Sequence, residues 1–289
     1  MELINEIFDN CNNSIFKIFI STAAARKDVV RQHRHTEFEL SLILSGKGIY
    51  KTENGNFDIQ EGDIFLYSTN EYHCITDIFP DGDNLYMKLL NIHFSPSYIM
   101  GTDSLNRNTE YMNIFFSRKT PFENRIDRTN IYNPKLRELI LSVKSECENK
   151  EPCYEAIVFA RLTEILTLLL RHYNLTENKN VKSLCHIDNI SSAITYINEH
   201  YNENITLNDI TKAAHMHKTS FIANFKAIYN MTTWDYINIK RIEDSLTLLK
   251  STDLTILDIA TKCGFNSTAN FNKIFKKTTG ITPSEYRKK

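Results

Sequence analysis

An internal repeat in the last hundred residues constrains the fold of this chain more than any other feature. The segment ITLNDI at 205–210 parallels LTILDI at 254–259 with an offset of 49 residues. At an offset of 50, Phe221, Phe225, Lys226, Asn230 and Thr232 parallel Phe271, Phe275, Lys276, Gly280 and Thr282. Each copy predicts a short helix, a turn and a second helix. The repeat therefore predicts two helix-turn-helix motifs.

Between the copies, residues 232–252 predict one amphipathic helix that fixes the separation of the two motifs. Its buried side would carry Ile237, Ile242, Leu246 and Leu249. The turns inside the motifs are expected at 214–217 and 263–266. We expect Trp234 in the core and Arg241 as a structural ion-pair partner.

The residues from 15 to 94 have a different pattern, in which short β-branched and aromatic runs alternate with turn signals. Residues 37–46 approach a period of two, as in a strand with one face on a core. Asn54-Gly55 indicates a hairpin, because both residues tolerate positive φ. Closely spaced strands without helices between them predict an antiparallel barrel or sandwich.

After residue 100 the pattern becomes helical. Asn133 and Pro134 predict the N-cap and first residue of a helix that runs to about Glu148, and a second helix is expected from 151–152 to Tyr173. Its apolar stripe consists of Ile157, Val158, Leu162, Ile165, Leu166, Leu169 and Leu170. This stripe either packs against the barrel or forms a dimer interface.

We therefore divide the chain into a sensor and dimerisation domain (1–173), a polar linker (174–186) and a DNA-binding domain (187–289). The overall net charge of −1 is an average, because residues 187–289 hold 13 Lys plus Arg against 10 Asp plus Glu. The N-terminus does not resemble a signal peptide, and the sequence has no apolar run of 18 residues. The six cysteines form no CxxC motif. We expect a reduced, cytoplasmic protein without membrane contact.

The segments YINEHYNENITLNDITKAAHM, YINIKRIEDSLTLLKSTDLTILDIA and CGFNSTANFNKIFKKTTGITPSEYR occur in this order within the last domain. Through them the chain closely resembles the AraC/XylS family of bacterial transcriptional regulators. The resemblance implies that two recognition helices enter successive major-groove segments of promoter DNA. It also favours activation through contact with RNA polymerase.

The second motif offers polar side chains beside its buried stripe, and asparagine can pair with adenine and lysine with guanine. Its candidate DNA contacts are Ser267, Thr268, Asn270, Asn272, Lys273 and Lys276. In the first motif the resemblance implies contacts by Lys218, Thr219, Ile222 and Ala223. Ala223 stands where the family commonly has arginine, and Asn224 where it has an apolar residue. The first motif is therefore expected to depend more on phosphate contacts and DNA shape.

The N-terminal domain contains a pattern similar to the cupin motifs. His33, His35, Glu39 and Gly46 fit the first motif, and Gly62, Asp63 and His73 fit the second, which departs at Ser68 and Asn70. Three imidazoles and a carboxylate could bind Fe, Mn, Zn or Ni. Regulators of the resembled family often use this pattern for a small effector without metal. We therefore expect no cofactor or metal, and the candidate effector contacts are His33, His35, Glu39, Tyr50, His73 and His93.

The sequence predicts a multidomain chain: a cupin-like antiparallel β-barrel with following helices, then an all-α double helix-turn-helix domain. We expect a sequence-specific transcriptional activator and not an enzyme. Its expected partners are promoter DNA, RNA polymerase, a small effector in the barrel and a second copy of the chain. The alternative is a metal-dependent cupin enzyme fused to a DNA-binding domain, for which His33, His35, Glu39 and His73 would be the metal ligands.

Overall fold

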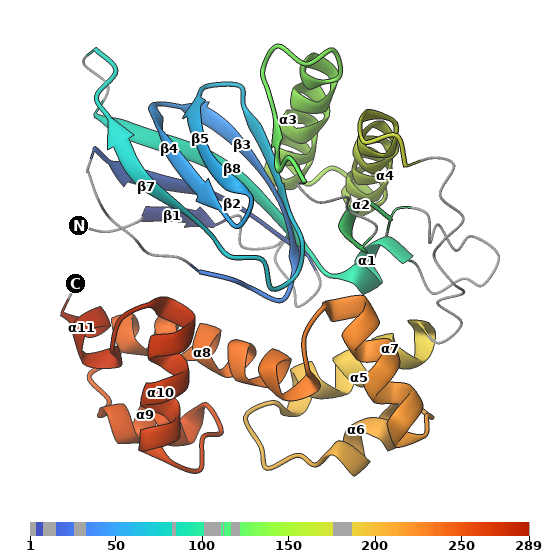
Figure 1. Ribbon diagram of the computed structural model, residues 1–289, viewed down its shortest axis with the longest axis vertical. Helices are drawn as coiled ribbons and strands as arrows, with labels where there is room; N and C mark the ends of the chain where they lie inside the picture. The colour runs from blue at the N-terminus through green and yellow to red at the C-terminus, as the bar shows by residue number, and fades with distance from the viewer. Residues whose placement is uncertain are drawn as a thin grey trace. The chain divides into compact units, whose positions relative to one another are not determined.

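The computed structural model describes residues 4–7, 16–25, 33–82, 85–100, 111, 113–116, 122–175 and 187–288. The chain forms two compact units (Figure 1). The first unit comprises residues 1–30 and 37–183, and the second comprises residues 31–36 and 184–289. From residue 176 onward, the predicted linker lies outside the described residues.

The first unit contains antiparallel strands in two sheets. Their bounds are β1 Ile4–Ile7, β2 Phe16–Ala24, β3 Phe38–Ser45, β4 Lys47–Thr52, β5 Gly55–Gln60, β6 Ile64–Tyr67, β7 His73–Phe79, β8 Tyr86–Phe94 and β9 Arg125–Ile126. One sheet has the order β1-β2-β8-β3-β6-β9, and the other β5-β4-β7. The predicted antiparallel β domain is confirmed, although its described strands form two sheets and not one closed ring. In the β4–β5 hairpin, Glu53 and Asn54 form the turn and Gly55 already pairs with Thr52.

Strand β3 is buried on both faces over most of its length, so the expected single buried face was wrong. Ile43 packs with Tyr50 of the smaller sheet in the core between the two sheets. On the opposite face, Phe38 stacks on Phe115, with ring centroids 3.6 Å apart. The helical segments after β8 therefore cover the face that would otherwise be solvated.

The described residues of the first unit also form the helices α1 Pro96–Met100 and α2 Asn113–Phe116, which precede β9, and α3 Asn133–Asn149 and α4 Tyr154–His172, which follow it. The long helices α3 and α4 pack against each other (Figure 1). On α4 the predicted stripe is buried apart from Ile157, which is 40% exposed. The N-cap of α3 is Tyr132 and not Asn133. Asn133 is instead the first helical residue, and its side-chain amide donates to the carbonyl oxygens of Gly62 and Ile126.

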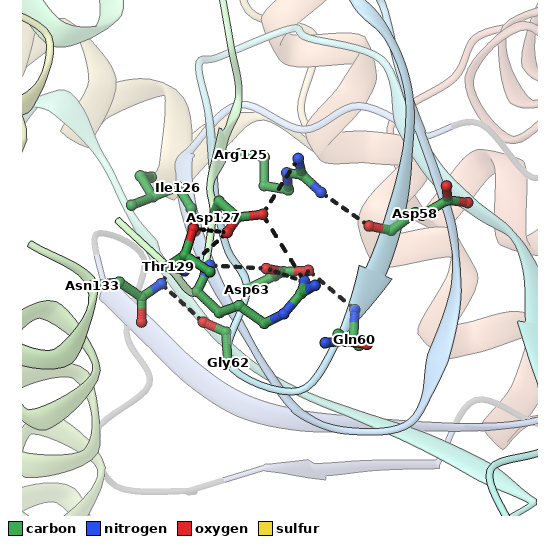
Figure 2. A network of polar contacts seen from close by, with 10 residues as sticks. Asp58, Gln60, Gly62, Asp63, Arg125, Ile126, Asp127, Thr129 and Asn133 are labelled. Atoms are coloured by element: carbon green, nitrogen blue, oxygen red, sulfur yellow. Dashed lines mark hydrogen bonds and ion pairs between the residues drawn. The ribbon is translucent and has the colours of Figure 1, made fainter. Parts of the chain in front are cut away.

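Figure 2 shows the polar network that connects the β5–β6 turn to the segment before α3. The fully buried Asp63 carboxylate accepts hydrogen bonds from the backbone N–H groups of Gln60 and Arg128, each at 3.1 Å. The Arg128 guanidinium donates to both Asp63 carboxylate oxygens at 3.2 Å. A buried carboxylate needs such partners to offset its desolvation. Gly62 and Asp63, taken from the sequence as part of a cupin motif, therefore have a structural role.

In the second unit, the described residues 187–288 form helices joined by short connections. Its helices are α5 Ile187–His200, α6 Leu207–Ala213, α7 Lys218–Tyr229, α8 Thr233–Ser251, α9 Ile256–Lys262, α10 Thr268–Thr279 and α11 Pro283–Arg287. We call α6 and α7 with their turn the first motif, and α9 and α10 with theirs the second motif. The two motifs lie at opposite ends of α8 (Figure 1). The predicted double helix-turn-helix is confirmed.

The repeat extends to the helix caps. Thr206 and Thr255 cap α6 and α9, and each forms a capping box with an aspartate three residues later. One turn after the recognition helices, Thr232 and Thr282 cap α8 and α11. Because these caps satisfy backbone N–H groups locally, the same helix boundaries occur twice.

A side chain of α8 binds the backbone of the loop between α5 and α6. The Arg241 guanidinium donates to the carbonyl oxygens of Tyr201 at 2.6 Å and Glu203 at 2.9 Å. Arg241 is therefore structural, as expected, but it binds backbone and not a carboxylate. The expectation for Trp234 was wrong, since its side chain is 44% exposed. The neighbouring core is filled by the mutually packed rings of Phe225, Tyr229 and Tyr236, which leaves the indole outside.

Candidate DNA-binding surface and effector site

The second recognition helix, α10, buries Phe271, Phe275 and Thr278 in the core of the second unit. Its other side carries the residues expected to contact DNA. Asn270, Asn272, Lys273 and Lys276 are exposed, and Thr268 is half-buried. Ser267 is exposed, but its hydroxyl caps α10 by accepting from the backbone N–H of Asn270. This cap fixes the start of α10 beside the exposed polar side chains of the helix.

The first recognition helix, α7, buries Phe221, Phe225, Ile228 and Tyr229. Its expected contacts Lys218, Thr219, Ile222 and Ala223 are all exposed. Asn224 is half-buried, and its side-chain amide donates to the backbone carbonyl of Ser220 at 2.8 Å. The Asn224 amide thus binds the backbone of its own helix and does not point outward toward DNA.

Two exposed lysines on these helices were missed at the level of sequence. Lys226 of α7 is exposed, like its repeat partner Lys276 of α10. Lys277 of α10 is exposed as well. The signal for Lys226 was already present in the repeat, because Lys276 had been selected and the two positions are equivalent. Such lysines can neutralise DNA phosphates without reading sequence.

In the first unit, strands β3, β7 and β8 place three of the expected effector contacts together. Glu39 pairs directly with His93 across the strands. One carboxylate oxygen of Glu39 lies 3.2 Å from Nε2 of His93 and 3.1 Å from Nε2 of His73. His73 is fully buried, and its Nδ1 contacts the carbonyl oxygen of Glu71 at 3.0 Å. We call Glu39, His73 and His93 the buried polar cluster.

Neighbouring polar side chains hold this cluster, and sequence reasoning missed them. Ser41 donates to the second carboxylate oxygen of Glu39 at 2.5 Å and lies 2.7 Å from the Asn91 side-chain oxygen. The Asn91 amide in turn donates to Ser21 at 3.0 Å. Ser41 could have been found from its position two residues after Glu39, which places both on one face of a strand.

Tyr50 also lies near the cluster, with its ring 6.2 Å from that of His73, while the Tyr67 ring stacks on His73 at 4.0 Å. Burial raises the pKa of both phenols well above the ordinary value, and the Glu39 carboxylate raises it further. Both tyrosines are therefore neutral hydroxyl groups at physiological pH. They extend the polar end of a core that is otherwise apolar.

The remaining candidates, His33 and His35, lie on the segment 31–36, which belongs to the second unit. His33 is exposed and His35 is buried, and their rings are 6.3 Å apart. The buried polar cluster consists of a carboxylate and two imidazoles, which are side chains that can bind a metal ion. The same groups can equally donate to and accept from an organic effector.

Comparison with known proteins agrees with this arrangement. The model of the AraC-like ligand binding domain matches residues 16–107, and that of a helix-turn-helix domain matches residues 210–289. The melibiose operon regulatory protein of Escherichia coli is 25% identical over 89% of this chain and 83% of its own length. The transcriptional activator RhaR of Mannheimia succiniciproducens is 26% identical over 88% and 86%.

Among solved structures, ToxT from Vibrio cholerae has the same fold, with a TM-score of 0.58 over 95% of this chain and 98% of its own, at 16% identity. No helix in the described part of the chain has the length and apolar character to span a membrane. The two domain models match in order along one chain, and the relatives extend over most of its length. The chain therefore belongs to the AraC family of transcriptional regulators, with an N-terminal ligand-binding domain and a helix-turn-helix DNA-binding domain.

Proposed function

We propose that this chain activates transcription by inserting α7 and α10 into the major groove of promoter DNA. The observation that carries the proposal is the pair of helices at opposite ends of α8, each with an apolar side buried and its other side exposed. Such a helix fits the major groove, whose width of about 12 Å admits it. Activation is supported by one relative's name, transcriptional activator RhaR.

The proposed DNA contacts fall on both helices. On α7 they are Lys218, Thr219, Ile222 and Ala223, and on α10 with its N-cap they are Ser267, Thr268, Asn270, Asn272, Lys273 and Lys276. We propose that the second motif supplies most of the direct base readout, since its asparagines and Lys273 are exposed. In the first motif the polar Asn224 is engaged by its own helix.

The ligand-binding domain would respond to a small effector through the buried polar cluster. Glu39 is 3% exposed and His73 is fully buried, so their polar groups contact each other and not solvent. Such groups are costly to bury, so a core without function would more simply be apolar. An effector that engages Glu39, His73 or His93 would change the side-chain contacts among β3, β7 and β8.

We further propose that the regulator works as a homodimer that contacts RNA polymerase and has no catalytic step of its own. Helix α4 leaves Ile157 40% and Phe159 38% exposed, which offers apolar area for a second copy. The relatives that match most of the chain are named as regulators and not as enzymes.

The DNA-binding proposal can be tested with the full-length protein and a pool of random duplexes. In vitro selection should enrich a defined sequence, and fluorescence anisotropy should then give its affinity at fixed salt. Lys273→Ala should weaken binding about tenfold or more, because a lysine contact to guanine is lost. Lys144→Ala is the matched control, since Lys144 lies on α3 in the first unit and pairs with Glu148. Equal affinities for wild type and Lys273→Ala would contradict the proposed role of α10.

A further inference from the structure

Ile222 is an apolar side chain on the outer face of the first recognition helix. It is 48% exposed, which is unusual for isoleucine, and it follows the fully buried Phe221 in the sequence. Exposed apolar area is unfavourable in water. A recognition helix that carries such a side chain is suited to an apolar partner.

Ile222 lies at the centre of a row of exposed side chains along α7. Lys218 stands four residues before it and Lys226 four residues after it, and both are exposed. Residues four apart share a helix face and are about 6 Å from each other along the helix axis. The two lysines therefore flank the isoleucine on either side and are about 12 Å from each other along the helix axis.

Small side chains border this row. Thr219 and Ala223 are both exposed and lie beside Ile222 on the helix surface. Ala223 projects only a methyl group, so it offers no hydrogen-bonding group of its own to a base edge. Asn224 does not compete for the groove, because its amide donates to the carbonyl oxygen of Ser220. Ile222 can then reach the base edges, while the lysines reach the phosphates on either side.

The second recognition helix has a different row at the equivalent positions. Thr268, Asn272 and Lys276 replace Lys218, Ile222 and Lys226 in the repeat. Asn272 is exposed and offers a donor and an acceptor to a base edge. At this position the first motif offers only methyl and methylene groups. In the major groove, the only apolar group on a base edge is the 5-methyl of thymine.

We propose that Ile222 reads a thymine through its 5-methyl group, so that the first motif has a base preference that depends on an apolar contact. This inference rests on the proposed insertion of α7 into the major groove. It identifies Ile222 as the specificity-determining residue of that motif, with Lys218 and Lys226 as phosphate contacts that position it.

The test uses the duplex enriched in the selection experiment above. Its thymines are replaced by deoxyuridine one at a time. Deoxyuridine keeps every hydrogen-bonding group and lacks only the methyl. For the wild-type protein, one such replacement should weaken binding about threefold to fourfold, as expected for the loss of one buried methyl group. For Ile222→Ala the same replacement should change the affinity by less than about twofold.

Two further variants sharpen the test. Ile222→Val retains a branched apolar side chain and should keep the discrimination between thymine and deoxyuridine. Asn272→Ala changes the equivalent position of the second motif and should leave this discrimination unchanged, although it weakens binding overall. Because Ile222 is exposed, thermal unfolding of its variants should match that of the wild type.

The outcomes separate the inference from the function on which it rests. If a sequence is selected and Lys273→Ala weakens binding, but no deoxyuridine replacement distinguishes wild type from Ile222→Ala, the methyl contact is wrong and DNA binding stands. If selection enriches no sequence at all, both the inference and the proposed function are overturned.

Discussion

The two helix-turn-helix motifs have the same backbone plan but present different chemistry. Both have a capped first helix, a turn with one residue in the left-handed region and a twelve-residue recognition helix. On the outer face, the second motif carries Asn272 and Lys273 where the first carries Ile222 and Ala223. The repeat thus conserves what forms the helices, while the exposed positions are free to differ.

The turns differ as well. The left-handed residue is His215 in the first motif, with φ +49°, and Gly264 in the second, with φ +84°. A Cβ on Gly264 would lie 2.6 Å from the backbone oxygen of Asn202, in the loop before α6. Gly264 is therefore required by a close approach between backbones as well as by its φ. This contact helps to fix the second motif against the first half of the unit.

The largest expected effect comes from filling that contact. Gly264→Ala should destabilise the second unit by about 3 kcal/mol, because it adds a steric clash to an unfavourable φ. Urea unfolding of the full-length protein can measure the change through fluorescence of Trp234, which is the only tryptophan and lies on α8. His215→Ala is the matched control in the first motif and should change the stability much less. Equal losses of stability in the two variants would show that a Cβ is tolerated no worse in the second turn than in the first.

A second experiment makes the outer face of the first motif resemble that of the second. Ala223→Lys introduces the residue found at the equivalent position 273, and it should strengthen DNA binding by about 1 kcal/mol. The dependence of log affinity on log salt should steepen by about one unit if the new lysine contacts a phosphate. Anisotropy titrations at several salt concentrations give both values. Unchanged affinity and slope would place position 223 outside the DNA interface.

The caps of the recognition helices provide a third contrast. Ser267 accepts a hydrogen bond from the backbone of α10, whereas His217 precedes α7 without a side-chain cap. Ser267→Ala should therefore cost about 1 kcal/mol of stability, and His217→Ala should cost little. The urea experiment with Trp234 fluorescence measures both. A comparable cost for His217→Ala would mean that its side chain supports α7 in another way.

The smallest effect is expected from relieving strain in the first turn. His215→Gly should stabilise the second unit by about 0.5 kcal/mol, because glycine adopts positive φ without a steric penalty. The gain is limited by the greater freedom of glycine in the unfolded chain. A clear loss of stability would instead assign a supporting contact to the His215 side chain.

The helical unit was largely predictable from sequence because its determinants are local. The threonine caps at 206 and 255 and the spacing of Phe221, Phe225 and their repeat partners define the helices without distant contacts. Trp234 was predicted wrongly, since its exposure depends on how three other rings fill the core. Periodicity predicts which face of a helix is buried, but it does not predict which large side chains on that face fit into the core.

The buried polar cluster was predicted only in part. Histidines and Glu39 stood out by residue type, whereas Ser41 and Asn91 did not. The register of β3 on β8 places Glu39 opposite His93 and Ser41 opposite Asn91. Because side chains alternate along a strand, a shift of one residue would place each of these groups on the other face.

By itself, the sequence determined the order of domains, the doubled motif and the bounds of the helix between its two copies, since hydrophobic spacing, caps and turn residues act within a few residues of each other. Tertiary structure alone decided that β3 is buried on both faces, that Gly62 and Asp63 support α3, and that Ile222 remains exposed on α7. These features depend on which segments, distant in the chain, exclude water from a given side chain. That competition for burial is settled only when the whole core has formed.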